Sequence, residues 1–184
     1  MIFIYVPKGA IEQITCPGIV LHEISHRFVC DLYKIPVYHV NYFSLDSESS
    51  GKVIHEKTHK LSQAFFIGMA PFFINSFIAM LLTIPYRICL GSMSLRNPSS
   101  NIFINILYIV ISWVGVTAGM HAIPSNQDLK GLKNFAHTKI SKFFITILIS
   151  CVAIFNIPTI GLLLRFIYTI ILMLVTGALL FGNI

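Results

Sequence analysis

Long apolar runs, interrupted at a few polar points, divide the chain into helix-sized segments. The run from Cys16 to Tyr33 is short for a full membrane span, and it predicts a buried, partly embedded helix. The runs Leu61–Ile84 and Ile102–Ala122 are long enough to cross about 30 Å of hydrocarbon at about 1.5 Å per residue. The apolar tail 143–184 is broken near Pro158, so it predicts two more helices. We therefore expect about five membrane-embedded helices.

The polar segments between these runs have patterns of their own. Residues 35–59 alternate apolar and polar positions in VYHVNYF, pass through the turn-like DSESSG and resume in KVIHEKTH. This pattern predicts a β-hairpin just after the first helix. Residues 1–14 predict only a strand or an interfacial segment without chemistry of its own. The segment from Pro85 to Ser100 predicts a polar connection between two spans.

Composition supports a membrane protein. Of 184 residues, 55% are hydrophobic and only 11% are charged, which is far more apolar than a soluble domain of this length needs. We expect one all-α integral membrane domain over residues 1–184, with a core at 15–135 and C-terminal helices at 143–184. The lipid bilayer is its expected surrounding, and nothing in the composition favours a nucleic-acid partner.

The net charge of +6 is concentrated between the apolar runs. Segments 34–60 and 130–142 carry four lysines each, whereas the connection between them carries only Arg87 and Arg96. Because cytosolic loops of membrane proteins are enriched in lysine and arginine, this distribution predicts that the lysine-rich loops face the cytosol.

The first helix carries a candidate catalytic motif. His22, Glu23 and His26 read H-E-x-x-H, which places both imidazoles on one helical face. If that face binds zinc, Glu23 is positioned to take a proton from a water molecule at the metal. The alternative is a polar helix face that lines a water or substrate path without metal. Neighbouring apolar residues provide a wall of low dielectric, namely Ile19, Val20, Leu21, Phe28 and Val29.

A second H-E-x-x-H occurs at His55, Glu56 and His59. Lys57 and Lys60 make its surroundings charged and solvated, and nearby cations oppose metal binding. We interpret this copy as a decoy. Its first two residues, His55 and Glu56, can still border the active site on a strand edge near the substrate.

A catalytic zinc usually takes three protein ligands and leaves one position open. Asp128 is the favoured third ligand, because it follows a span that can pack on the first helix and its carboxylate offsets the metal charge. His121 is the competing ligand, with His39 behind it. The alternatives are that Asp128 is an ordinary capping or loop acid and that His121 is a structural histidine. The four cysteines lack C-x-x-C spacing, which argues against a thiolate site.

Together these features resemble the site-2 protease family of intramembrane zinc metalloproteases. The order of elements is HEISH in an apolar helix, a strand-like segment with Gly51, a span with Gly68, Pro71 and Asn75, and then an aspartate after a proline-bearing loop. The resemblance covers about residues 15–135. The chain also looks like compact metalloproteases of bacterial and archaeal membranes, which implies a prokaryotic cell membrane.

The resemblance implies a function and a set of site residues. The function is hydrolysis of peptide bonds in or near the membrane, with a membrane protein or peptide as substrate. Zn²⁺ would be the cofactor and Glu23 the base that activates water. The implied metal ligands are His22, His26 and Asp128, and the implied cavity and substrate-binding residues are Asn75, Gly51 and His55.

The chain departs from the family pattern after the aspartate, where Leu129 and Lys130 stand in place of glycine. The Gly-Pro pair is also separated, with two residues between Gly68 and Pro71. These departures motivate an alternative, a non-catalytic zinc-binding scaffold or pseudoprotease that holds a partner helix. A third hypothesis is a small transporter that uses the histidines as proton relays.

Overall fold

The structure, a computed structural model, describes residues 8–44, 50–94, 102–158 and 160–182. Within these ranges the chain forms seven α-helices, one 3₁₀ helix and two strands. In chain order they are α1 (Lys8–Ile14), α2 (Cys16–Leu32), β1 (Val37–Asn41), β2 (Lys52–His55), α3 (Leu61–Gly68), α4 (Ala70–Ser94), α5 (Ile102–Met120), η1 (Lys130–Phe135), α6 (Lys139–Phe155) and α7 (Ile160–Phe181).

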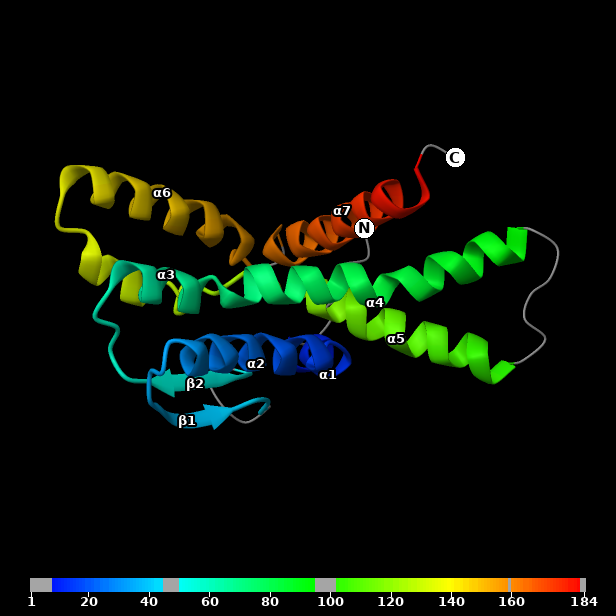
Figure 1. The fold of residues 1–184 in the computed structure, drawn as a ribbon, viewed down its shortest axis with the longest axis horizontal. Coiled ribbons are helices and arrows are strands. Elements are labelled where there is room, and N and C mark those ends of the chain that lie inside the picture. The colour runs from blue at the N-terminus through cyan, green and yellow to red at the C-terminus, as the bar shows by residue number, and fades with distance from the viewer. Residues whose placement is uncertain (1–7, 45–49, 95–101, 159, 183–184) are drawn as a thin grey trace, which may run out of the picture.

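Helices α4 and α5 form a long antiparallel pair around which the other elements are placed (Figure 1). Helix α2 packs against both of them near one end, and the β-hairpin lies along α2. Helix α7 packs against α4 and α5, and in Figure 1 it lies with α6 on the side opposite the hairpin. Elements from both halves of the chain therefore meet around the α4–α5 pair.

Three helical segments are long and apolar enough to cross a membrane in the described part of the chain, not the five expected. They are 61–84, 102–120 and 160–180. Helices α2 and α6 have 17 residues each, about 25 Å at 1.5 Å per residue, which is shorter than about 30 Å of hydrocarbon. The prediction of five embedded helices included the run from Cys16 to Tyr33 as a partly embedded helix and counted two helices in the tail 143–184, of which only 160–180 is long enough to cross.

The second apolar run differs from its prediction at both its middle and its end. It breaks at Met69 into α3 and α4, and α4 then continues to Ser94. The predicted polar connection from Pro85 to Ser100 is therefore wrong for its first ten residues, which are helical. A proline removes one intrahelical hydrogen bond, and a long apolar helix tolerates that loss. Residues 95–101, which include Arg96, lie outside the described residues.

The predicted hairpin is confirmed. Strands β1 and β2 pair antiparallel, with Val37 opposite His55 and Val40 opposite Val53. The predicted turn falls largely on residues 45–49, which lie outside the described residues. At the N-terminus, residues 8–14 form helix α1, so the strand that was one of the two predictions for residues 1–14 is wrong there.

The backbones of α2 and α5 nearly touch at Gly18. A Cβ atom at this position would lie 2.0 Å from the carbonyl oxygen of Thr117, so only glycine permits the approach. On the other side of the site, buried Leu129 and Leu132 pack in a core with residues of α3 and α6. These two contacts fix the segment after α5 relative to α2.

Candidate metal centre

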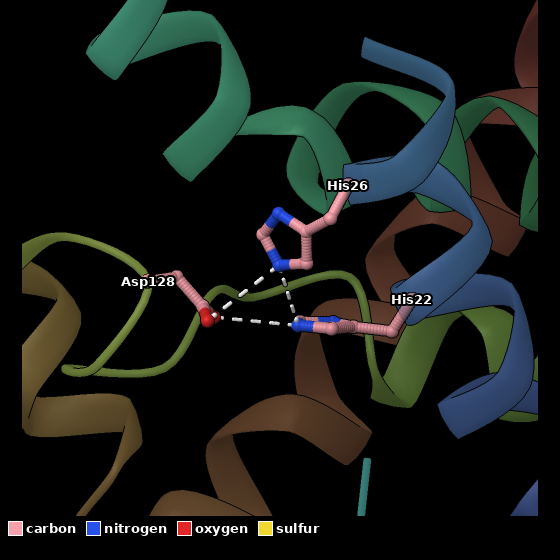
Figure 2. Close-up of side chains that lie close together, drawn as sticks. All are labelled: His22, His26 and Asp128. Atoms are coloured by element: carbon pink, nitrogen blue, oxygen red, sulfur yellow. Dashed lines mark hydrogen bonds and ion pairs between the residues drawn. The ribbon is translucent and has the colours of Figure 1, made fainter. Parts of the chain in front are cut away.

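Three side chains from two distant parts of the chain converge on one point. His22 and His26 extend from α2, and Asp128 extends from the loop between α5 and η1 (Figure 2). The Nε2 atoms of the two histidines are 3.2 Å apart. The Asp128 oxygens lie 3.3 Å from Nε2 of His22 and 3.6 Å from Nε2 of His26. In the described residues this is the one group of three or more histidine, cysteine and acidic side chains close enough to hold a metal ion.

These separations fit a metal ion. Ligand atoms around a tetrahedral zinc, with bonds of about 2.0–2.1 Å, lie about 3.3 Å from one another. The separation between the two Nε2 atoms is close to that value, and so are the separations from Nε2 of His22 to Oδ2 of Asp128 and from Nε2 of His26 to Oδ1. Two imidazole nitrogens and one carboxylate oxygen are also a ligand set that suits zinc, with positions left open for water or substrate.

Hydrogen bonds fix the tautomers of both histidines. Nδ1 of His22 lies 2.7 Å from the carbonyl oxygen of His121, and Nδ1 of His26 lies 2.8 Å from that of Ile67. A carbonyl oxygen only accepts, so both Nδ1 atoms donate. In the neutral imidazoles both Nε2 atoms therefore carry lone pairs, which face each other and the carboxylate. A cation between them resolves this contact of three acceptors.

Both accepting carbonyls are freed by interruptions in helices. In an unbroken helix the Ile67 oxygen would accept from the backbone N–H of residue 71, but Pro71 has none. The His121 oxygen lies just past the end of α5, where the last carbonyls have no helical partner. The interruptions near Pro71 and Pro124 thus provide the acceptors that orient the two imidazoles.

Asp128 is also held in place by its neighbours. The backbone N–H of Ser125 donates to its carboxylate over 2.6 Å, and the Ser125 hydroxyl accepts from its backbone N–H over 3.3 Å. Burial acts to raise the pKa of Asp128, but its close contacts with His22 and His26 outweigh that effect and hold the pKa well below its usual range. The carboxylate is therefore charged and suited to a cation.

Glu23 lies beside this group on the wall of a cavity of about 1350 Å³. Only 7% of the residue is exposed, and burial raises the pKa of its carboxyl group above the ordinary value. The chain comes close to it at Gly51, where a Cβ atom would lie 2.7 Å from Oε1 of Glu23. Gly51 thus makes room for the carboxylate, and both residues line the cavity.

Asn75 lies behind the site, away from the cavity wall. It is fully buried and does not line the cavity, where the sequence interpretation had placed it. In the orientation that satisfies both of its polar atoms, its amide nitrogen donates to the Ser25 hydroxyl over 2.7 Å and its amide oxygen accepts from the backbone N–H of His22 over 3.3 Å. Asn75 therefore anchors α2 at His22, one of the candidate metal ligands.

The competing third ligands point elsewhere. The ring of His121 is bonded through Nε2 to the hydroxyl of Thr15, 2.9 Å away, and only its backbone carbonyl contacts His22. Burial, with a smaller effect from the charges of His22 and Arg165, lowers the pKa of His121 to about 3. His39 is exposed on β1. The structure thus brings Asp128, and neither of these histidines, to His22 and His26.

The second H-E-x-x-H copy does not form a helical turn. His55 ends β2, and His59 precedes the start of α3, so the two imidazoles do not share a helical face. Nδ1 of His55 bonds to the backbone carbonyl of Glu56, 2.6 Å away, and Glu56 and His59 are exposed. Residues 50–58, including His55, nevertheless line the cavity that contains Glu23.

Sequence reasoning missed two contributors to the site. Ser125 orients Asp128, and Arg165 lines the cavity from α7. An ionisable residue inside an apolar run was the available signal for Arg165. Comparisons of the chain with known protein families, curated proteins and solved structures find no match.

Proposed function

We propose that this chain is a membrane-embedded zinc metalloprotease that hydrolyses peptide bonds in or near the bilayer. The observation that carries the proposal is the convergence of His22, His26 and Asp128 beside a buried glutamate on the wall of a large cavity. Bound zinc would supply Lewis acidity, which activates water and polarises a carbonyl group.

Glu23 is the proposed base. Its carboxylate accepts a proton from water in the cavity and later donates that proton to the leaving amine. A pKa raised by burial favours this use, because a base with a pKa closer to neutrality also returns the proton readily. The apolar residues around Glu23, among them Ile19 and Ile67, limit competing water.

The β-hairpin supports an extended peptide as the substrate. In the described residues β2 pairs only with β1, and residues 50–58 line the cavity. An unpaired strand edge offers backbone donors and acceptors to an added strand. The peptide would lie along this edge with a backbone carbonyl near Glu23.

The proposed location is a prokaryotic cell membrane with the lysine-rich loops in the cytosol. The link between β2 and α3, which carries Lys57 and Lys60, lies at the same end of the molecule as η1 and the start of α6 (Figure 1). This common position is what the positive-inside rule requires of Lys57, Lys60 and the lysines in segment 130–142.

Paired substitutions test the proposal. Glu23→Gln is expected to retain zinc in a one-to-one ratio but to lose cleavage of quenched fluorogenic apolar peptides, whereas His22→Ala is expected to lose both. Asp31→Asn is the matched control, because Asp31 sits at the end of the same helix in an exposed ion pair with Arg27, 3.2 Å apart. Absence of bound zinc in the unsubstituted protein would refute the proposal.

The same variants distinguish the proposed protease from the non-catalytic alternative. A scaffold or pseudoprotease that holds a partner helix would keep its biological output in Glu23→Gln, since the metal and the fold are retained. Loss of output in Glu23→Gln at normal expression favours the protease.

A further inference from the structure

Arg165 is a cation inside a helix that is long and apolar enough to cross a membrane. It lies in α7, and its side chain lines the cavity that also contains His22 and Asp128. A charged side chain in such a helix is costly unless it pairs with an opposite charge or faces a polar cavity. The partners of Arg165 therefore decide what it can do.

The partners of Arg165 in the structure are neutral. Its Nε donates to the carbonyl oxygen of Phe155 over 3.2 Å, and its Nη2 donates to the amide oxygen of Asn156 over 2.6 Å. Both acceptors lie at the C-terminal end of α6. In the described residues no carboxylate lies within ion-pair distance of the guanidinium group. Its positive charge is thus not compensated by a direct contact.

The guanidinium group of Arg165 has N–H donors that Phe155 and Asn156 do not use. Nε and one N–H of Nη2 are used, which leaves both N–H groups of Nη1 and the second of Nη2. Two parallel N–H groups on a planar fork match the two oxygens of a carboxylate. Phe155 and Asn156 hold the guanidinium group through Nε and Nη2, and Arg165 lines the cavity.

The surroundings indicate what kind of molecule would carry the carboxylate. Apolar residues line the cavity near the α6–α7 junction and across from it, namely Phe155, Ile157, Leu162, Ile11 and Ile19. Arg165 is close enough to Asp128 for their charges to interact. An anion bound at Arg165 would therefore lie in the same cavity as the proposed metal.

We propose that Arg165 binds a carboxylate of the substrate, which is an otherwise apolar peptide with either a free C-terminal carboxylate or one acidic side chain. The proposal rests on the proposed function for the reaction that follows, but the binding itself needs no turnover. Arg165 acts here as a binding residue that selects and positions the peptide.

A purely structural role is the competing explanation. A cation near the last carbonyls of a helix stabilises that end, and Arg165 contacts the end of α6 in this way. Such a role predicts no preference for a carboxylate in the ligand. The decisive measurement is therefore discrimination between ligands, with fold and metal content as controls.

The test uses the full chain in detergent micelles, with Glu23→Gln so that bound peptides are not cleaved. Three fluorescent leucine- and alanine-containing hexapeptides are compared by anisotropy: a free C-terminal acid, its amide, and an amide with one internal aspartate. We expect at least one carboxylate form to bind about tenfold tighter than the plain amide. The form that gains affinity identifies the source of the carboxylate. Equal binding of all three overturns the proposal.

Two further arms assign the effect to Arg165. In Arg165→Gln the preference should disappear while the affinity for the plain amide is retained, and in Arg165→Lys a reduced preference should remain. The preference should also persist after chelation of the metal, because Arg165 is not a ligand. A preference that survives in Arg165→Gln means that another group binds the carboxylate. A preference that needs the metal means that the metal binds it. Either result overturns the proposal.

The lysine variant protects the test against misfolding. If Arg165→Gln fails to retain zinc, the comparison is made with Arg165→Lys, where an undiminished preference counts against the fork geometry. A chain that discriminates between the peptides but cleaves none of them refutes the proposed protease while leaving the role of Arg165 supported.

Discussion

Nδ1 of His26 donates to the carbonyl oxygen of Ile67 over 2.8 Å, across the interface between α2 and α3. Because Nδ1 carries the proton, Nε2 of His26 has a lone pair, which faces the other two proposed ligands, His22 and Asp128. The carbonyl is available because Pro71, four residues later, offers no N–H. The orientation of one ligand thus depends on a proline that does not touch the metal position.

Pro71→Ala is expected to weaken zinc binding about tenfold, without loss of the fold, because the new backbone N–H competes for the Ile67 carbonyl. Competition with a zinc-chelating dye measures the change. The matched control is Pro85→Ala in the same helix, about 21 Å further along at 1.5 Å per residue. Equal zinc affinities for all three proteins would contradict this account of the His26 orientation.

The two H-E-x-x-H copies are expected to differ in metal binding. His26→Ala should abolish stoichiometric zinc, whereas His59→Ala should leave one zinc per chain, because the second copy is exposed and does not form a helical turn. Elemental analysis of the purified variants gives the ratio directly. Zinc lost from the His59 variant and kept in the His26 variant would move the site to the second copy.

Gly51→Ala is expected to retain zinc and to reduce peptide cleavage by about tenfold or more, since the new methyl group displaces the Glu23 carboxylate. Gly131→Ala is the matched control, because a Cβ atom there meets nothing within 4 Å. Both variants are compared by zinc content and by initial cleavage rate. Full activity of Gly51→Ala would show that Glu23 does not need its present position.

Gly18→Ala is expected to destabilise the fold by at least about 2 kcal/mol, because the methyl group would overlap the Thr117 carbonyl and force α2 away from α5. Thermal unfolding in detergent, monitored by circular dichroism, measures the loss. Gly9→Ala in α1 serves as the control, since its added methyl group meets nothing within 4 Å. Unchanged unfolding of Gly18→Ala would mean that the two helices separate easily.

The sequence predicted those features that depend on local pattern. The bounds of α2 follow from one apolar run, and the hairpin follows from alternation around a polar turn. The extension of α4 past Pro85 was missed, because a proline and nearby arginines are typical of a loop, whereas a long apolar helix tolerates a proline. The number of embedded helices was overestimated because two of the apolar runs form α2 and α6, whose 17 residues each are too few to cross the hydrocarbon.

The candidate site was predictable in part. His22, His26 and Glu23 share a short motif, and Asp128 was the one acid in a suitable position after a span. The parts that could not be predicted are backbone groups, namely the carbonyls of Ile67 and His121. Every residue has a backbone carbonyl, and only the fold determines which carbonyls are free to accept from a histidine ring. The same limit explains why the direction of the Asn75 side chain was not predicted. Its residue type indicates a polar side chain but not whether that side chain faces the cavity or α2.

The distance along the chain between His22 and Asp128 has a consequence for assembly. The two residues are 106 positions apart, and between them lie the hairpin and the α4–α5 pair. A metal ion shared by them would act as a cross-link that closes this long loop, and closing a long loop restricts the unfolded chain more than closing a short one. A bound metal would then raise the free energy of unfolding, and chelation would lower it, while the packing of α2 against α4 and α5 keeps the helix in place in the native state.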